Sequence, residues 1–112
     1  MNLNQVTVPS LDLTKAMPFY VKLGLKLIVE SLPDYARFEC PDGYSTFSIH
    51  RTDSLPKGEG ISIYFECTNL DEYVNKLIKK GIVFEQTPTN QKWLWREARL
   101  KDVDGNQLIL WR

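Results

Sequence analysis

The chain has 112 residues, a length that one compact domain can hold before larger chains divide. Its 14 basic and 14 acidic residues balance and no basic run occurs, so we do not expect nucleic acid as a partner. An apolar fraction of 43% can build a core and differs from the composition of disordered chains. We therefore expect a single folded domain over residues 1–112.

The sequence has no signal for a membrane or for secretion. No stretch approaches the roughly 20 apolar residues of a membrane helix, and the first ten residues lack the basic and apolar regions of a signal peptide. We expect a cytoplasmic protein with no membrane partner. Cys40 and Cys67 have no second pair to form a zinc knuckle, and small cytoplasmic domains rarely hold disulfides, so we expect inert buried thiols.

The first half of the chain predicts one strand, one helix and three more strands. Alternating β-branched residues predict the strand over 5–9, and apolar residues at helical spacing predict a helix from Leu13 to Leu23, ended by Gly24. Pro18 should shorten or kink this helix, because proline removes a backbone hydrogen bond. Further strands are expected over 25–30, 36–40 and 45–51, with the turn Pro41-Asp42-Gly43 between the last two.

The second half repeats this order after a polar loop over 52–60. Eleven positions separate Leu13 from Gly24, and eleven also separate Leu70 from Gly81, where a second helix is expected after the N-cap Asn69. The strands of this half are expected over 61–67, 82–86, 93–102 and 106–112.

Each half has one helix and about four strands, which is too little to bury a sheet face alone. We therefore expect two βαβββ modules, residues 1–53 and 60–112, to pack together as one α+β domain.

Three segments resemble a known family over essentially the whole chain. They are Leu11-Asp12-Leu13 with Phe19-Tyr20 and Leu23-Gly24-Leu25; Asn69-Leu70-Asp71 with Gly81; and Trp95-Arg96-Glu97-Ala98 leading to Asp102-Val103-Asp104-Gly105-Asn106. Together they resemble the vicinal oxygen chelate superfamily, which includes glyoxalases, bleomycin-resistance proteins and extradiol dioxygenases. The third is similar to the hairpin of bleomycin-resistance-type members, although 94–96 lacks the usual glycine and Val103 replaces proline. The resemblance implies eight strands curled into a cup that binds a small molecule.

Catalytic members of this superfamily hold one metal ion in the cup through four side chains. The resemblance places these positions at Gln5, at Phe47 or, with a slip of one residue, Ser48, at Ser62 and at Ile109. Glutamine is a weak oxygen donor, a serine hydroxyl is a poor ligand for zinc, nickel or iron, and isoleucine has no donor atom. We therefore expect no metal and no other cofactor, and an apolar binding cup in their place.

Aromatic residues are the leading candidates for ligand contacts. All three tryptophans lie in the last predicted hairpin, and Trp93 and Trp95 would share one strand face because they are two positions apart. In the family register, Tyr64 and Phe47 would join these tryptophans in the cup, where rings can stack on a planar or amphiphilic ligand. The same rings could instead fill the core.

The polar candidates leave two alternatives open. Arg96 and Arg99, with Glu97 between them, could contact a ligand or lie on a solvated strand. His50, the only histidine, shares a strand face with Ser48, and that face could line the cup or the outside of the sheet. The predicted binding residues are Gln5, Phe47, Ser62, Tyr64, Trp93, Trp95, Arg96, Ile109 and Trp111.

These observations predict a metal-free binding protein of the bleomycin-resistance type. It would capture an amphiphilic or aromatic compound, such as an antibiotic, in a Trp-lined cup without a catalytic residue, and the resemblance implies a homodimer. One alternative is a glyoxalase-like lyase or isomerase acting through Gln5 and groups such as Glu39, Glu66, Glu97 or His50. Another is a regulatory or interaction module that uses the cup for a protein partner.

Overall fold

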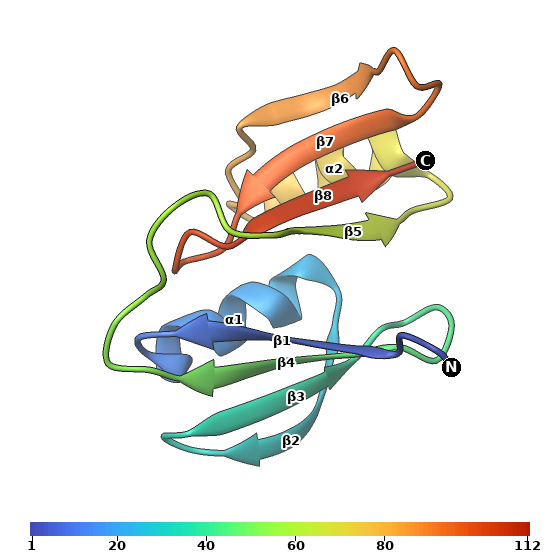
Figure 1. Ribbon diagram of the computed structural model, residues 1–112. Coiled ribbons are helices and arrows are strands. Elements are labelled where there is room, and N and C mark those ends of the chain that lie inside the picture. The colour runs from blue at the N-terminus through green and yellow to red at the C-terminus, as the bar shows by residue number, and fades with distance from the viewer. The chain divides into compact units, whose positions relative to one another are not determined.

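The computed structural model describes residues 1–112. The chain divides into two units, Met1–Pro56 and Lys57–Arg112, and the boundary falls within the predicted polar loop over 52–60. Each unit contains one helix and one four-stranded sheet (Figure 1). The predicted α+β fold of two βαβββ modules is therefore confirmed.

The first unit follows the predicted order of elements. Its elements are β1 (Gln5–Ser10), α1 (Leu13–Leu23), β2 (Lys26–Ser31), β3 (Tyr35–Glu39) and β4 (Thr46–Arg51). The strand order in the sheet is β1-β4-β3-β2, with β1 parallel to β4 and the other neighbours antiparallel. Each predicted element agrees with the observed one to within one residue at either end.

Helix α1 begins and ends where local residues satisfy its backbone. The Asp12 carboxylate accepts hydrogen bonds from the backbone N–H of Thr14 at 3.0 Å and from its hydroxyl at 2.6 Å, which lowers the pKa of Asp12. Gly24 ends the helix at a φ of 116°, a left-handed conformation that favours glycine. The helix continues for 11 residues through Pro18, which does not end it.

The core of the first unit lies between α1 and one face of its sheet. The buried Tyr20 ring has its centroid 4.6 Å from that of Phe47 and 5.7 Å from that of Phe38. Successive strand residues point to opposite faces of a sheet, so the strand residues on either side of Phe38 and Phe47 point away from α1. We call this opposite side the first open face, and its residues include Gln5, Thr7, Tyr35, Arg37, Thr46, Ser48 and His50.

The second unit repeats this topology. Its elements are β5 (Ser62–Glu66), α2 (Leu70–Lys79), β6 (Gln86–Asn90), β7 (Arg96–Lys101) and β8 (Gln107–Trp111). The strand order is β5-β8-β7-β6, again with one parallel pair, β5 and β8. Asn69 is the N-cap of α2 as predicted, but its side chain makes no capping hydrogen bond. Neither α1 nor α2 is long and apolar enough to cross a membrane.

Helix α2 and one face of the second sheet enclose the core of this unit. The helix contributes Leu70, Val74 and Leu77, all buried. The buried strand residues on the same side are Ala98, Leu100, Leu108 and Leu110. Alternation again directs the intervening residues away from the helix. We call that side the second open face, and its residues include Ser62, Tyr64, Glu66, Glu97, Arg99, Ile109 and Trp111.

The predicted strand over 82–86 is wrong, because the strand lies later in the chain. Ile82 is buried, and its backbone N–H donates to the Leu77 carbonyl at 3.0 Å, so it closes the end of α2. Strand β6 begins at Gln86 and contains Pro88. Proline is tolerated there because β6 is an edge strand that pairs only with β7.

The predicted strand over 93–102 begins three residues too early. Residues 91–95 form a turn in which the Leu94 N–H donates to the Gln91 carbonyl and Leu94 has a φ of 73°. Trp93 and Trp95 therefore lie in the turn before β7 and do not share a strand face. The tight turn overrides the β propensity of its aromatic residues.

The turn between β7 and β8 is organised by one buried carboxylate. Asp102 accepts hydrogen bonds from the backbone N–H groups of Asp104 and Asn106, each at 2.9 Å, and from the Asn106 side chain at 2.8 Å. Gly105 has a φ of 86°, which the turn requires. This part of the most family-like segment therefore shapes the hairpin that carries Trp111.

Candidate ligand-binding site

Three aromatic side chains meet at one end of the second sheet. The Trp95 and Trp111 rings stack with centroids 3.9 Å apart and an interplanar angle of 13°. Tyr64 meets Trp95 edge to face at 6.0 Å. Tyr64 is 46% exposed and Trp95 38% exposed, so much of both rings remains accessible. We call Tyr64, Trp95 and Trp111 the aromatic cluster.

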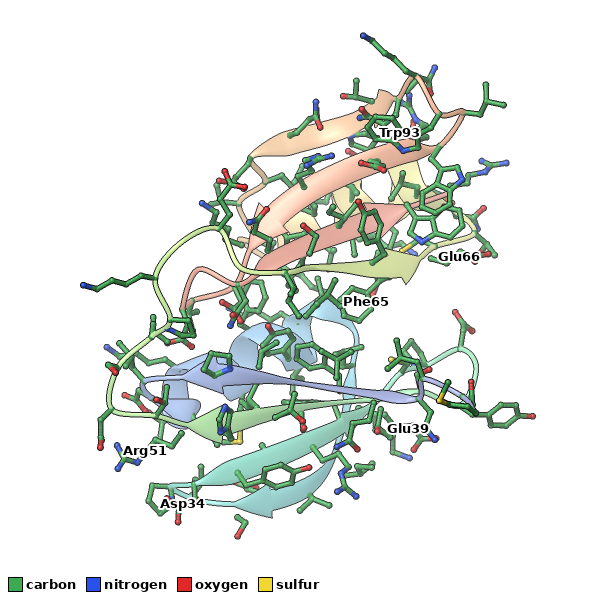
Figure 2. All side chains as sticks on the ribbon, in the orientation of Figure 1. Asp34, Glu39, Arg51, Phe65, Glu66 and Trp93 are labelled. Carbon is green, nitrogen blue, oxygen red and sulfur yellow. The ribbon has the colours of Figure 1, made fainter.

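A buried carboxylate supports the residues beside this cluster. Glu97 is 0% exposed and lies in register with Trp111. One of its oxygens accepts from Trp93 Nε1 at 2.9 Å, and the other accepts from Arg99 Nη2 at 3.0 Å. Figure 2 shows Trp93 beside β6 and β7. Because both carboxylate oxygens are bonded, Glu97 holds Trp93 and Arg99 in fixed positions.

Arg96 points to the opposite side of the sheet from Arg99. Its guanidinium forms a bidentate pair with Asp71 of α2, at 2.8 Å from Nε to Oδ1 and 3.0 Å from Nη2 to Oδ2. Its remaining Nη1 donates to the Asn90 side chain at 3.0 Å. The hydrogen bonds from Arg96 lower the pKa of Asp71. Arg96 therefore connects β7 to α2 and β6, and it does not join the aromatic cluster.

Two further predicted residues lie on the second open face. Ile109 is buried and lies in register with Tyr64 on one side and Arg99 on the other. It provides an apolar surface next to the aromatic cluster. Ser62 also lies on this face, but it is the exposed first residue of β5 and pairs with Gln107.

In the first unit, the prediction that Phe47 contacts a ligand is wrong, because the neighbouring Ser48 takes the place on the open face. Phe47 packs against Tyr20 in the core, whereas Ser48 lies on the first open face. The one-residue slip considered from sequence is therefore the observed register. Gln5 lies on the same face, and its Oε1 accepts from Thr46 Oγ1 at 2.7 Å. His50 is exposed on this face as well, in register with Tyr35.

The first open face also carries a polar group that the sequence analysis missed. Arg37 Nε donates to the Tyr35 hydroxyl at 3.0 Å, and the hydroxyls of Ser48 and Thr7 lie 2.6 Å apart. Hydrogen bonding from Ser48, and then from Arg37 and Gln5, lowers the pKa of Tyr35. Alternation within the predicted strand over 36–40 could have placed Arg37 opposite Ser48.

The side chains at the family's metal positions do not fit a divalent ion. Ile109 has no donor atom, Ser62 and Ser48 offer only neutral hydroxyls, and the Gln5 oxygen accepts from Thr46. No group of three His, Cys, Asp or Glu side chains is close enough to hold an ion. Structural and catalytic metal sites use three or four nitrogen, sulfur or carboxylate donors, which these positions lack.

The two cysteines are free, and both are half-buried rather than fully buried as predicted. Burial raises the pKa of the Cys40 thiol, so it is a weaker nucleophile than an exposed cysteine at neutral pH. The Cys67 thiol lies 3.8 Å from the Phe65 carbonyl oxygen.

The chain resembles known proteins over nearly its full length. The family model described as the glyoxalase/bleomycin resistance protein/dioxygenase superfamily matches residues 2–110. No curated protein matches the chain in sequence.

Three solved structures illustrate the likeness in fold. A bleomycin resistance determinant encoded on the transposon Tn5 has 20% identity and a TM-score of 0.84, covering 100% of this chain and 98% of its own. A bleomycin-binding protein complexed with bleomycin has 20% identity and a TM-score of 0.80, with the same coverage. A lactoylglutathione lyase from Agrobacterium tumefaciens has 17% identity and a TM-score of 0.80, covering 98% of this chain and 92% of its own.

At these identities the solved structures establish the fold, and the family model establishes membership. The chain therefore belongs to the glyoxalase/bleomycin resistance protein/dioxygenase superfamily.

Proposed function

We propose that this protein reversibly binds a small amphiphilic or aromatic molecule on the second open face, without a metal ion and without chemical turnover. The observation that carries the proposal is the aromatic cluster, in which a stacked tryptophan pair and a tyrosine remain partly exposed. Exposed aromatic rings provide large apolar contact areas with defined stacking geometry. A planar ligand that covers them would remove this apolar surface from water.

The surroundings of the cluster support a preorganised site. Glu97 fixes Trp93 and Arg99 through hydrogen bonds, so little side-chain freedom remains to be lost when a ligand binds. Ile109 adds a buried apolar surface next to Tyr64. Trp93, Tyr64, Trp95, Ile109 and Trp111 are the proposed ligand contacts, with Ser62 farther along β5.

The residue types at the family's metal positions support binding over metal-dependent catalysis. An isoleucine and neutral hydroxyls avoid the cost of burying unpaired charges when no ion is present. The isoleucine at position 109 also provides an apolar side chain, whereas a metal-binding carboxylate side chain at this position would repel an aromatic ring. A similar solved structure is that of a bleomycin-binding protein in complex with bleomycin, which supports an organic ligand.

We further propose that the protein acts in the cytoplasm and that it is a homodimer, the state that its family resemblance implies. Light scattering coupled to gel filtration measures the mass directly. A mass of two chains at micromolar concentration is expected, and a mass of one chain at every concentration would exclude the dimer.

The binding proposal is tested by isothermal titration calorimetry with a panel of aromatic compounds, including bleomycin, planar dyes and amphiphilic antibiotics. At least one compound should bind with a saturable isotherm and unchanged chemical structure after prolonged incubation. Metal analysis of the purified protein should find no stoichiometric divalent ion. A tightly bound ion whose removal abolishes lyase or dioxygenase activity would overturn the proposal in favour of an enzyme.

A protein partner is the other outcome that would contradict it. If no small compound binds and the intact protein instead forms a stoichiometric complex through Trp95, the second open face is an interaction surface.

A further inference from the structure

The first open face carries a cluster of hydrogen-bond donors at the centre of its sheet. Five side chains from β1, β3 and β4 form it, and we call them the polar cluster. They are Gln5, Thr7, Tyr35, Arg37 and Ser48. The polar cluster belongs to the first unit, and the aromatic cluster belongs to the second.

Contacts within the polar cluster leave two donor groups of Arg37 without an acceptor. Arg37 Nε donates to the Tyr35 hydroxyl at 3.0 Å, and the guanidinium carbon lies 5.7 Å from the centroid of the Tyr35 ring. The two Nη groups have no hydrogen-bond acceptor, and such a pair of donors can recognise two oxygens side by side. Ser48 and Gln5 also lie within hydrogen-bonding reach of the Tyr35 oxygen and contribute to lowering the pKa of Tyr35. Ser48 itself is fully buried and lies 2.6 Å from the Thr7 hydroxyl, which fixes it in place.

Arg37 differs from the other strand arginines in lacking an acidic partner. Arg51, Arg96 and Arg99 each have a carboxylate oxygen within 4.0 Å. No ion pair involves Arg37, although it is half-buried. Glu39 lies two positions further along β3 on the same face, at the end labelled in Figure 2, and it is in register with Lys26 of β2.

Arg37 of the first unit and Arg99 of the second occupy equivalent positions in their sheets, but only Arg99 has an acidic partner. In the second unit, Arg99 pairs across the sheet with Ile109 and is neutralised by Glu97, two residues earlier. In the first unit, Arg37 pairs with Ser48, and the residue two positions earlier is Tyr35. A phenol fixes the guanidinium as the carboxylate does, but it leaves the positive charge uncompensated.

We propose that the polar cluster binds an oxyanion, namely the carboxylate or phosphate group of a small molecule. The Nη groups of Arg37 would bind two oxygens side by side, and the Tyr35 hydroxyl would donate to one of them. Ser48 and Gln5 act as positioning residues that hold the Tyr35 oxygen. The inference goes beyond the proposed function, since it concerns the other sheet and does not require an aromatic ligand.

The test uses the full chain and simple anions. Sodium phosphate and sodium acetate are titrated separately at constant ionic strength, while the Arg37 Nε–H signal and the backbone amide signals of Tyr35 and Ser48 are followed by NMR. Saturable shifts are expected with a dissociation constant on the order of 1 mM, a modest affinity for one charged group. The tighter of the two anions identifies the source of the oxyanion. Shifts that stay linear and equal to those with chloride would overturn the inference.

Matched variants assign the site to Arg37. Arg37→Gln should weaken the binding of the tighter anion at least tenfold. Arg37→Lys should weaken it less, because lysine keeps the positive charge but lacks the paired Nη donors. The control is Arg51→Gln, which removes another arginine of the same sheet that already has acidic partners, and its binding should be unchanged. An equal loss in Arg51→Gln would mean that net charge alone attracts the anion. Trp95→Ala should retain anion binding, so failure of the aromatic site and failure of this site are distinguishable.

Discussion

The two sheets have the same strand order and the same alternation, but their open faces differ in chemistry. At the central crossing of strands, the first face has Thr7, Ser48 and Arg37 in register. The second face has Tyr64 and Ile109 at the corresponding positions, with Arg99 beyond them. The topology therefore sets where side chains can meet, and the residue types decide what the face can bind.

The clearest difference between the faces is the partner of the arginine, which is a carboxylate for Arg99 and a phenol for Arg37. Glu97 neutralises Arg99, so the arginine of the second face carries no uncompensated charge beside the aromatic cluster. Tyr35 holds Arg37 without neutralising it, which leaves the first face rich in donors. One fold repeated within one chain therefore presents an aromatic cluster in one unit and a donor-rich polar cluster in the other.

Removing Glu97 should have the largest effect, because it breaks the neutral pair on the second face. In Glu97→Ala, Arg99 and the Trp93 indole lose a charged acceptor, but both donors are partly exposed and can bond to water, so the free energy of unfolding should fall by about 2 kcal/mol. Urea unfolding followed by circular dichroism measures this change.

The control for that variant removes an exposed acid from the same sheet. Glu85→Ala breaks an ion pair with Lys101 in which both side chains are about half exposed, and it should change stability by less than about 0.5 kcal/mol. If the two variants lose the same stability, the burial of Glu97 has no energetic importance and the contrast between the faces is weaker.

Trp95→Ala tests the aromatic side of the comparison. Losing the ring that contacts both Trp111 and Tyr64 should weaken the binding of the tightest aromatic ligand by about 30-fold, the effect of a typical hot-spot truncation. Calorimetry measures the affinity, and Tyr44→Ala is the control because Tyr44 is an almost fully exposed aromatic residue outside both faces. Unchanged affinity in Trp95→Ala would place the ligand elsewhere.

Most of the fold could be predicted from sequence because its signals are local. The helix at 13–23 has its N-cap Asp12 and its terminal Gly24, and its spacing recurs in the second half. The strand over 82–86 was misplaced because Ile82 has strand character, yet tertiary packing uses it to close α2.

The candidate site was harder to predict, because it depends on register and turn geometry. A slip of one residue decides whether Phe47 or Ser48 reaches the open face, and composition does not fix that slip. The contact between Trp95 and Trp111 depends on a turn with a positive φ at Leu94, which has no simple sequence signal. The pairing of Arg96 with Asp71 joins residues 25 positions apart and was not foreseen.

Tyr35→Glu would convert the first face toward the chemistry of the second. A carboxylate two residues before Arg37 reproduces the spacing of Glu97 and Arg99, so the guanidinium should become ion-paired and anion binding should fall at least about tenfold. The NMR titration with phosphate or acetate measures the loss. Tyr35→Phe is the comparison variant, because it removes the donor but adds no charge, and it should weaken binding only a few-fold. Equal losses in the two variants would show that the donor matters and the free charge does not.

The smallest expected effect is spectroscopic and concerns the ionisation of Tyr35. Hydrogen bonds from Ser48, and then from Arg37 and Gln5, lower its pKa below the ordinary value near 10, so its phenolate should form at a lower pH than that of an exposed tyrosine. The difference in ultraviolet absorbance between the wild type and Tyr35→Phe isolates this transition from the other tyrosines.

The sign of the linked stability change follows from that lowered pKa. Because the folded state favours the phenolate, the stability that Tyr35 contributes increases as pH rises through its folded pKa and is complete above its unfolded pKa.

Saturating phosphate or acetate should raise the pKa of Tyr35 again, because a bound anion beside Arg37 disfavours a second negative charge on the tyrosine. His50 and Glu39 share this face, and the Glu39→Gln and His50→Gln variants should leave the direction of the anion effect unchanged. If a saturating anion leaves the Tyr35 transition unchanged, the anion does not bind beside Tyr35, and the polar cluster is not its binding site.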